Sequence, residues 1–218
     1  MDLLSYQRTV FAFHGCDRRV ADAFLSGKEK LAVSENTQDW LGHGIYFWKH
    51  GPARAFEWAR QQAGLKASKI KKPAILGAII SLGNCFDLLD IEFTDTLAAV
   101  ASEVEAAFTA AGRSIPENQT TGKGDYDWLR RDRDCFILNH SLPVIERTEG
   151  LTFHTVRGVF QERETAFKGA GIKRKSHIQV AVRDPHAIIG YFSPEGRYTH
   201  AHEVCGKAKN WNLSEARE

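Results

Sequence analysis

Short apolar segments that end in turns, separated by helical stretches of unequal length, constrain the fold of this chain more than any other feature. The clearest is AILGAIISL at residues 74–82, which predicts a buried strand. The same reasoning predicts further strands at 9–14, 44–48, 153–160, 177–182 and 187–192, and helices at 18–26, 52–63, 95–111 and 127–139. Because these strands and helices do not alternate regularly, we expect an α+β fold rather than a doubly wound parallel sheet.

The size and composition are those of one globular domain. The chain has 218 residues, of which 43% are hydrophobic, enough to bury a core. We expect a single domain at 1–218, with its core at 9–82 and 150–205 and a helical insertion at about 84–150. The formal net charge of +2 does not by itself require a nucleic-acid or membrane partner.

The N-terminal segment and the cysteines indicate a cytoplasmic protein. The start, Met-Asp-Leu-Leu-Ser-Tyr-Gln-Arg, lacks the basic flank and long apolar region of a signal peptide, and no apolar run is long enough to span a membrane. The four cysteines, which we expect to be reduced thiols, are too far apart for a zinc site: Cys16, Cys85, Cys135 and Cys205. We therefore expect no membrane contact and no bound metal.

The first predicted strand ends on a His-Gly step, His14-Gly15. An imidazole at a strand end can hydrogen-bond a sugar hydroxyl. A glycine has no Cβ, so its main chain can approach a planar amide closely. A strand end with an internally bonded histidine explains the same dipeptide, so both interpretations stay open.

A glycine-rich turn opens the next predicted strand, in the sequence Gly42-His-Gly44-Ile-Tyr46-Phe. On an extended strand Tyr46 points to one face, while Ile45 and Phe47 point to the other. The tyrosine ring could stack on a planar heterocycle, although an aromatic core strand has the same pattern. The turn is not the G-x-G-x-x-G loop of a Rossmann fold, which also needs a crossover unit.

Together these motifs resemble the poly(ADP-ribose) polymerase and diphtheria-toxin-like branch of the ADP-ribosyltransferase superfamily. His14 and Tyr46 match its first two signature positions, and a helix with spaced alanines follows at 52–63. The resemblance covers 11–60 and implies an ADP-ribosyltransferase-like split, mixed β-sheet core with NAD as substrate. It further implies that the Gly15 main chain holds the nicotinamide carboxamide, His14 binds the adenosine ribose and Tyr46 stacks on the nicotinamide.

The third signature position departs from the family pattern. In that branch a glutamate on a later strand usually completes the site, but the strand at 177–182 has none. His177 and Gln179 occupy its polar face and are expected to contact NAD. Glu162 and Glu164, well ahead of the strand, resemble the Glu-x-Glu loop motif of arginine-directed toxins. Gln179, Glu162 and Glu164 are therefore alternatives for the third catalytic role, and the missing glutamate argues against chain elongation.

The polar segment before the glycine turn is also expected to line the NAD site. It contains Ser34, Asn36, Asp39 and Trp40, and Gly44 follows in the turn itself. Hydroxyl, amide and carboxylate groups there could bind sugar hydroxyls. Ordinary turn chemistry, in which such side chains bond to nearby main-chain groups, explains the same residues.

Several charged residues have two interpretations. Arg54, at the start of the helix at 52–63, could meet a phosphate of NAD or be a solvated helix residue. The basic runs at 66–72 and 173–175 are typical of solvated loops, but the second adjoins the predicted catalytic strand and could bind a nucleic-acid acceptor. Asp132 and Asp134 are expected to be surface charges of the helix at 127–139.

The resemblance implies an NAD-dependent mono-ADP-ribosyltransferase that modifies a protein or nucleic acid. By analogy it is of the toxin–antitoxin or phage-defence kind, with an antitoxin or inhibitor protein as a partner. Two other activities on the same fold stay open: an NAD glycohydrolase, and an RNA 2′-phosphotransferase using His177, Arg183 and Arg54. A degenerate module that binds ADP-ribose or nucleic acid without transfer is a further alternative, which the missing glutamate favours.

Overall fold

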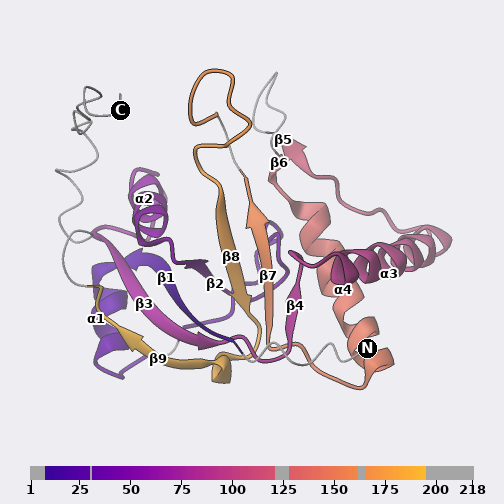
Figure 1. Cartoon of the computed structure of the whole chain (residues 1–218), viewed down its shortest axis with the longest axis horizontal. Helices are drawn as coiled ribbons and strands as arrows, with labels where there is room; N and C mark the ends of the chain where they lie inside the picture. Colours follow the sequence, from indigo (N-terminus) through magenta and orange to yellow (C-terminus); the bar gives the residue numbers. More distant parts are fainter. Residues whose placement is uncertain (1–7, 30, 121–127, 162–164, 195–218) are drawn as a thin grey trace, which may run out of the picture.

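The computed structural model describes residues 8–29, 31–120, 128–161 and 165–194. Seven of its strands form one sheet in the order β4-β7-β8-β2-β1-β3-β9, and β5 and β6 form a second, two-stranded sheet (Figure 1). All neighbours in the large sheet are antiparallel except β4 beside β7. The predicted α+β class is therefore confirmed.

In chain order the elements are β1 Thr9–Asp17, α1 Arg18–Leu25, β2 Ile45–Lys49, α2 Pro52–Ala63, β3 Pro73–Ser81, β4 Cys85–Asp87, α3 Ile91–Ala110, β5 Gln119–Thr120, β6 Trp128–Arg130, α4 Asp132–Glu149, β7 Thr155–Phe160, β8 His177–Val182, a 3-10 turn Pro185–Ala187 and β9 Ile188–Phe192.

Helices α1 and α2 cover opposite faces of the β1–β3 half of the sheet. Phe24 of α1 packs beside Leu76, whereas Ala55 of α2 packs beside the neighbouring Ile75. Because successive residues of a strand point to opposite faces, the two helices lie on different sides of β3. In Figure 1, α2 stands above the strands and α1 lies at the left edge beside β9.

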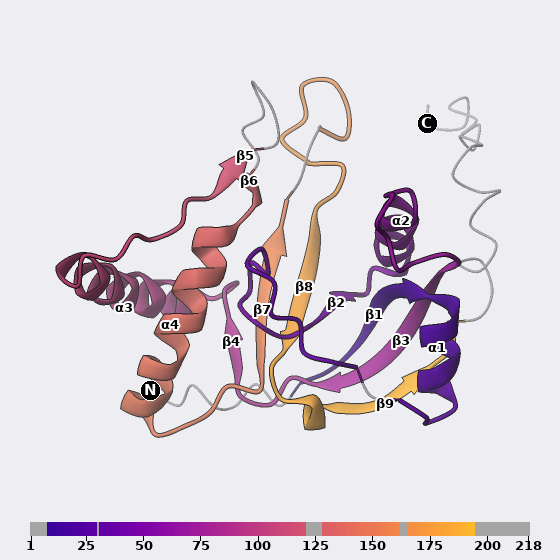
Figure 2. The ribbon, with the colours of Figure 1, turned by 180° about the vertical axis from the view of Figure 1, so that it is seen from behind.

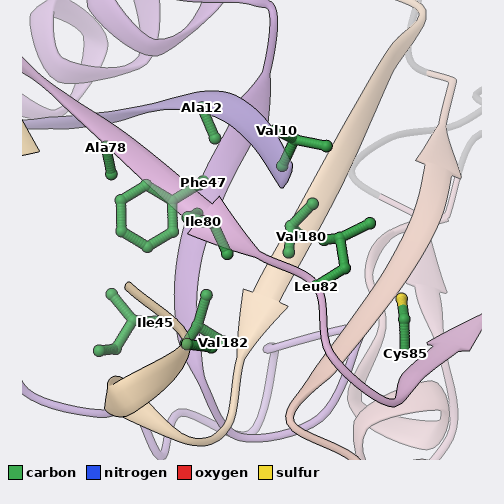
Figure 3. Close-up of a cluster of buried hydrophobic side chains, with 11 residues drawn as sticks. Val10, Ala12, Ile45, Phe47, Ala78, Ile80, Leu82, Cys85, Val180 and Val182 are labelled. Carbon is green, nitrogen blue, oxygen red and sulfur yellow. The ribbon is translucent and has the colours of Figure 1, made fainter. Parts of the chain in front are cut away.

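One buried cluster spans the centre of the sheet. Most of its side chains come from the neighbouring strands β8, β2, β1 and β3, and they converge on a single face (Figure 3). Ile45 and Phe47 of β2 belong to it, which confirms that they point away from the face of Tyr46. The members are Val10, Ala12, Ile45, Phe47, Ala78, Ile80, Leu82, Cys85, Val180, Val182 and Ala187.

A second cluster joins α3 and α4 to the strands at the other end of the sheet. Figure 2 shows both helices beside β4 and β7, away from α1 and α2. Phe86 and Phe153 meet edge to face at 5.1 Å between ring centroids, and Trp40 belongs to the same cluster. The helical segment is therefore packed on the sheet and reaches the loop that carries Trp40.

The predicted bounds of one helix in this segment are wrong. The predicted helix at 127–139 begins later and ends later: β6 occupies Trp128–Arg130 and α4 is Asp132–Glu149. This helix runs through Pro143, which lacks a main-chain donor and whose ring crowds the carbonyl of the preceding turn. It ends at Gly150, which is in the left-handed region with φ 65°. The segment at 84–150, predicted as a helical insertion, also contains β4, which joins the main sheet.

The other predicted elements are confirmed within a few residues. The helix at 52–63 and the strand at 177–182 have the predicted bounds. Helix α3 begins one turn earlier than predicted, because Asp90 caps it by accepting a hydrogen bond from the main-chain N–H of Glu92. Within the part of the chain that the structure describes, no helix is long and apolar enough to span a membrane.

Candidate functional site

The principal candidate site, here called the central cavity, lies where two neighbouring strands stop pairing. β1 pairs with β3 along its whole length, but with β2 only at Ala12 and Phe13. The cavity has a volume of about 390 Å³, within the range of small-molecule sites. Its lining residues come from β1, β2, β8, α2, the end of β7 and the loop at 31–44: His14, Ala32, Ser34, Asn36, Gln38, Asp39, Trp40, Gly44, Ile45, Tyr46, Trp48, Arg54, Trp58, Gln61, Phe160, His177 and Gln179.

His14 projects from β1 toward β2. Its Nδ1 donates a hydrogen bond of 2.8 Å to the main-chain carbonyl of Tyr46, and its ring lies 5.7 Å from that of Phe47. Because a carbonyl can only accept, Nδ1 carries the proton and Nε2 is left as an acceptor in the neutral ring. Burial lowers the pKa of His14 more than the bond to Tyr46 raises it, so the imidazole is neutral at pH 7.

Tyr46 is held rigidly by the glycine turn. Its hydroxyl donates to the carbonyl of Gly42 and accepts from the N–H of Leu41, both at 2.8 Å. Burial, followed by the nearby Asp39 carboxylate, raises the pKa of Tyr46 well above its ordinary value, so the phenol stays protonated. The hydroxyl is committed to the turn, and the ring is the part of Tyr46 that can contact a ligand.

Gln179 sits in the middle of β8 with its amide oriented by two neighbours. Trp40 Nε1 donates to Gln179 Oε1 at 2.6 Å, and Gln179 Nε2 lies 3.2 Å from His177 Nε2. His177 Nδ1 donates to the carbonyl of Lys175 at 2.9 Å, so its Nε2 is the acceptor and Gln179 Nε2 the donor. This network leaves one N–H of Gln179 for a ligand in the central cavity.

The loop at 31–44 forms one wall of the central cavity and is bonded to itself. Asn36 Nδ2 donates to Ser34 Oγ at 2.7 Å, and the main-chain N–H of Asn36 donates to Asp39 Oδ2 at 2.9 Å. Ser34 and Gly44 exchange two main-chain hydrogen bonds. The turn chemistry considered above for these residues is therefore present, and the same side chains also line the cavity.

A neighbouring groove continues the central cavity toward basic residues. Arg54 and His177 line both, and the groove also contains Arg60, Arg174 and Lys175. One acid, Glu57, lies 2.6 Å from Lys175 Nζ and 3.7 Å from Arg54 NH1. The positive charge predicted near the start of β8 therefore lies beside the site.

Glycines at two predicted positions are needed for close packing. A Cβ on Gly15 would lie 2.4 Å from the carbonyl oxygen of Ala55 in α2, and one on Gly44 would lie 3.1 Å from Ala181 Cβ. Gly44 lines the central cavity, whereas the side of Gly15 that a Cβ would occupy is covered by α2. A main-chain contact of Gly15 with a ligand stays a prediction.

The structure brings together most of the predicted site residues, from four separate parts of the sequence: His14, Ser34, Asn36, Gly44, Tyr46, Arg54, His177 and Gln179. Glu162 and Glu164 lie outside the described residues. Of the described residues, no three histidine, cysteine or acidic side chains form a group able to hold a metal ion.

Sequence reasoning missed several aromatic residues of the site: Trp48, Trp58 and Phe160. Trp48 Nε1 is buried and finds no hydrogen-bond acceptor among the described residues, so it is a donor suited to a bound ligand. Trp48 lies opposite Gln179 in the β2–β8 pairing, a relation that only the register of the sheet reveals. The aromatic run at 45–48 was the one signal that could have pointed to it.

Comparison with known proteins adds a relative but no function. No family model matches the chain. A protein of Methanocaldococcus jannaschii, described only as uncharacterized protein MJ0359, is 28% identical over 204 residues, covering 85% of this chain and 87% of its own. The similarity therefore extends along most of both chains and assigns no activity to either.

Proposed function

We propose that this protein is an NAD-dependent mono-ADP-ribosyltransferase with the split, mixed sheet of that superfamily. The observation that carries the proposal is the convergence of His14, Tyr46 and Gln179 on the central cavity. The resemblance selects His14 and Tyr46 by type and order, and it leaves Gln179 as one of three alternatives for the third position. His14, Tyr46 and Gln179 come from β1, β2 and β8, adjacent in the sheet although Gln179 is far away in the sequence.

NAD would lie across the end of the β1–β2 pairing. The Nε2 acceptor of His14 suits an adenosine ribose hydroxyl, and the Tyr46 ring, fixed by its two hydroxyl bonds, suits stacking on the nicotinamide. The loop groups of Ser34 and Asn36 would face the sugars. Arg54, whose side chain is only 15% exposed, would meet the pyrophosphate.

The reaction breaks the bond between the nicotinamide nitrogen and the ribose anomeric carbon. The bonding electron pair leaves with nicotinamide, and an acceptor nucleophile forms a new bond to that carbon and loses a proton. The transition state resembles an oxocarbenium ion, as in glycoside hydrolysis. Catalysis therefore requires the dinucleotide to be held in position and the developing positive charge to be stabilised.

Gln179 would supply the third role at this site. Its oriented amide can hydrogen-bond the hydroxyls of the nicotinamide ribose, using the N–H that Trp40 and His177 leave available. A neutral amide stabilises a developing cation less than a carboxylate does. We therefore propose transfer of a single ADP-ribose unit to a protein or nucleic-acid acceptor rather than chain elongation.

The decisive experiment uses NAD labelled in its adenylate group, with total cellular protein and total RNA supplied separately as acceptors. Wild type is compared with Tyr46→Ala and Gln179→Ala, with Gln161→Ala as the matched control, because Gln161 is exposed and does not line the central cavity. Each variant is first checked for an unchanged thermal unfolding midpoint.

The expected result is label in one acceptor fraction, lost in the two cavity variants and retained in the control. Nicotinamide release without label in any macromolecule would favour an NAD glycohydrolase instead. Binding of NAD or ADP-ribose with no nicotinamide release would contradict transfer and favour the binding module. Removal of a 2′-phosphate from RNA would favour the phosphotransferase.

A further inference from the structure

A second and larger cavity, here called the rear cavity, lies on the other side of the loop at 31–44. Its volume is about 460 Å³, and sequence reasoning did not anticipate it. Figure 2 shows α4 rising toward β5 and β6 beside that loop. The lining residues are Thr37, His43, Pro116, Glu117, Gln119, Arg130, Asp132, Cys135, Phe136, Asn139 and His140.

One wall of the rear cavity is an aromatic group on α4. The rings of Phe136 and His140 lie 4.1 Å apart with an interplanar angle of 31°. Phe108 of α3 meets both edge to face, at 4.9 and 5.0 Å, and so fixes their orientation. Both rings remain partly exposed in the cavity, and they suit a flat aromatic ligand that can stack on them.

A buried carboxylate provides a hydrogen-bond acceptor in the rear cavity. Asp132 is only 7% exposed, which makes the prediction of a surface charge wrong for this residue. Asp132 Oδ1 accepts a hydrogen bond from Arg130 NH2 at 3.3 Å, and Oδ2 forms an ion pair with Arg130 Nε at 3.3 Å. Oδ2 is nevertheless buried without a hydrogen bond within the described part of the chain. A buried carboxylate oxygen in this state is best satisfied by an N–H donor from a ligand.

The remaining polar groups reinforce this preference for donors. His140 Nδ1 donates to the carbonyl of Phe136 at 2.7 Å, which leaves Nε2 as an acceptor. The amide of Asn139 is already engaged at both ends, by the N–H of His43 and by Cys135 Sγ. The rear cavity thus combines flat aromatic walls with hydrogen-bond acceptors.

We propose that the rear cavity is a nucleobase-binding site. A nucleobase has a flat aromatic face for the Phe136–His140 wall and N–H groups on its edge for Asp132. Arg130 has a side chain 45% exposed and would lie near the phosphate of the same nucleotide. The base could belong to a free nucleotide or to a single-stranded nucleic acid, since both present the same edge.

The rear cavity shares a wall with the central cavity. Cys135 Sγ lies 3.4 Å from the carbonyl of Asn36, and Asn139 Oδ1 accepts from the N–H of His43 at 2.9 Å. Asn36 also lines the central cavity. A ligand that shifts these contacts changes the affinity for NAD, and NAD changes the affinity for the ligand by the same factor. This coupling rests on the proposed function, whereas the nucleobase site does not.

The test is calorimetric titration of the full-length protein, without NAD, using AMP, GMP, CMP, UMP and a short single-stranded oligonucleotide. The isosteric variant Asp132→Asn removes the charged acceptor, and Phe136→Ala removes the stacking wall. Asp134→Asn is the matched control on the same helix turn, because Asp134 bonds Asn118 and does not line the rear cavity. His14→Ala reports binding in the central cavity instead.

We expect at least one probe to bind wild type with a dissociation constant below about 1 mM. Affinity should fall at least about tenfold in Asp132→Asn, because a hydrogen bond to a charged acceptor is lost, and should be unchanged in Asp134→Asn. Tighter binding of the oligonucleotide identifies a nucleic-acid strand as the source of the base, and binding of monophosphates alone identifies a free nucleotide.

Absence of binding by every probe at millimolar concentration would overturn the proposal. So would binding that is lost in His14→Ala and retained in Asp132→Asn, because the nucleotide would then occupy the central cavity. Neither result depends on catalysis, so failure here is distinct from failure of the proposed transferase activity. Thermal unfolding midpoints show whether Phe136→Ala is folded, and Asp132→Asn keeps the test decisive if it is not.

Discussion

Loss of the buried ion pair between β4 and β7 should destabilise the protein severely. Asp87 and Arg157 lie directly opposite in the β4–β7 pairing, and Arg157 Nε donates to Asp87 Oδ1 at 2.9 Å. A second bond joins Arg157 NH2 to Asp87 Oδ2. The two side chains are 3% and 7% exposed, so water cannot replace either partner.

The magnitude follows from that burial. Asp87→Asn keeps the shape of the side chain but leaves the Arg157 guanidinium charged, buried and without its carboxylate. Removing one member of a buried pair costs about 3–5 kcal/mol. Because a typical domain has a free energy of unfolding of about 5–15 kcal/mol, the variant should lose a large part of its stability. An apolar replacement of both residues, Asp87→Leu with Arg157→Met, should restore most of it, since no charge is then buried.

The assay is urea unfolding followed by circular dichroism for wild type, Asp87→Asn and the double variant. A loss below about 1 kcal/mol in Asp87→Asn would refute the reasoning, because that is the size expected of a solvent-exposed pair. A double variant no more stable than Asp87→Asn would refute it equally. Either result would mean that burial of the uncompensated charge is not what determines the cost.

Three further predictions concern the central cavity and the end of β1. In Gly158→Ala the new Cβ would lie 2.7 Å from the Trp40 ring, so the indole should shift and its hydrogen bond to Gln179 should break. Both the tryptophan emission and the affinity for NAD should therefore change. Burial lowers the pKa of His14 below 6.5, so the unfolded state binds more protons than the folded state in acid. The free energy of unfolding should therefore fall as the pH drops below 6.5. The urea midpoint of His14→Gln should depend less on pH than that of wild type. Asp17 accepts hydrogen bonds from the main-chain N–H groups of Lys72, Lys71 and Arg19, and these hold its pKa far below 3.8. The carboxylate therefore stabilises the folded state above pH 3.8, and this contribution is lost in stronger acid. Asp17→Asn should therefore unfold at lower urea concentration at pH 7 but approach wild type in acid.

Local patterns were sufficient for most of the fold. The apolar run at 74–82 predicted β3, the alternation at 177–182 predicted β8, and the proline at the start of 52–63 predicted α2. Each of these signals is contained within one element, because burial on one or both faces sets the side-chain pattern. The predicted helix at 127–139 ends too early because α4 is extended by contacts with distant residues: Leu142 and Ile145 pack in the same cluster as Phe86 of β4.

The sequence by itself determined the helices and strands and the α+β class, since these depend on the periodicity of apolar residues within each element. It also determined two residues of the central cavity, His14 and Tyr46, because they belong to a motif within about sixty residues. Only the tertiary structure decided how the polar residues of β8, His177 and Gln179, reach the same cavity. The strand order puts β8 beside β2, and Trp40 then orients Gln179 from a position 139 residues away. The rear cavity likewise depends on the docking of α4 against the loop at 31–44. Strand register and helix docking are set by contacts between distant residues, which a local pattern does not contain.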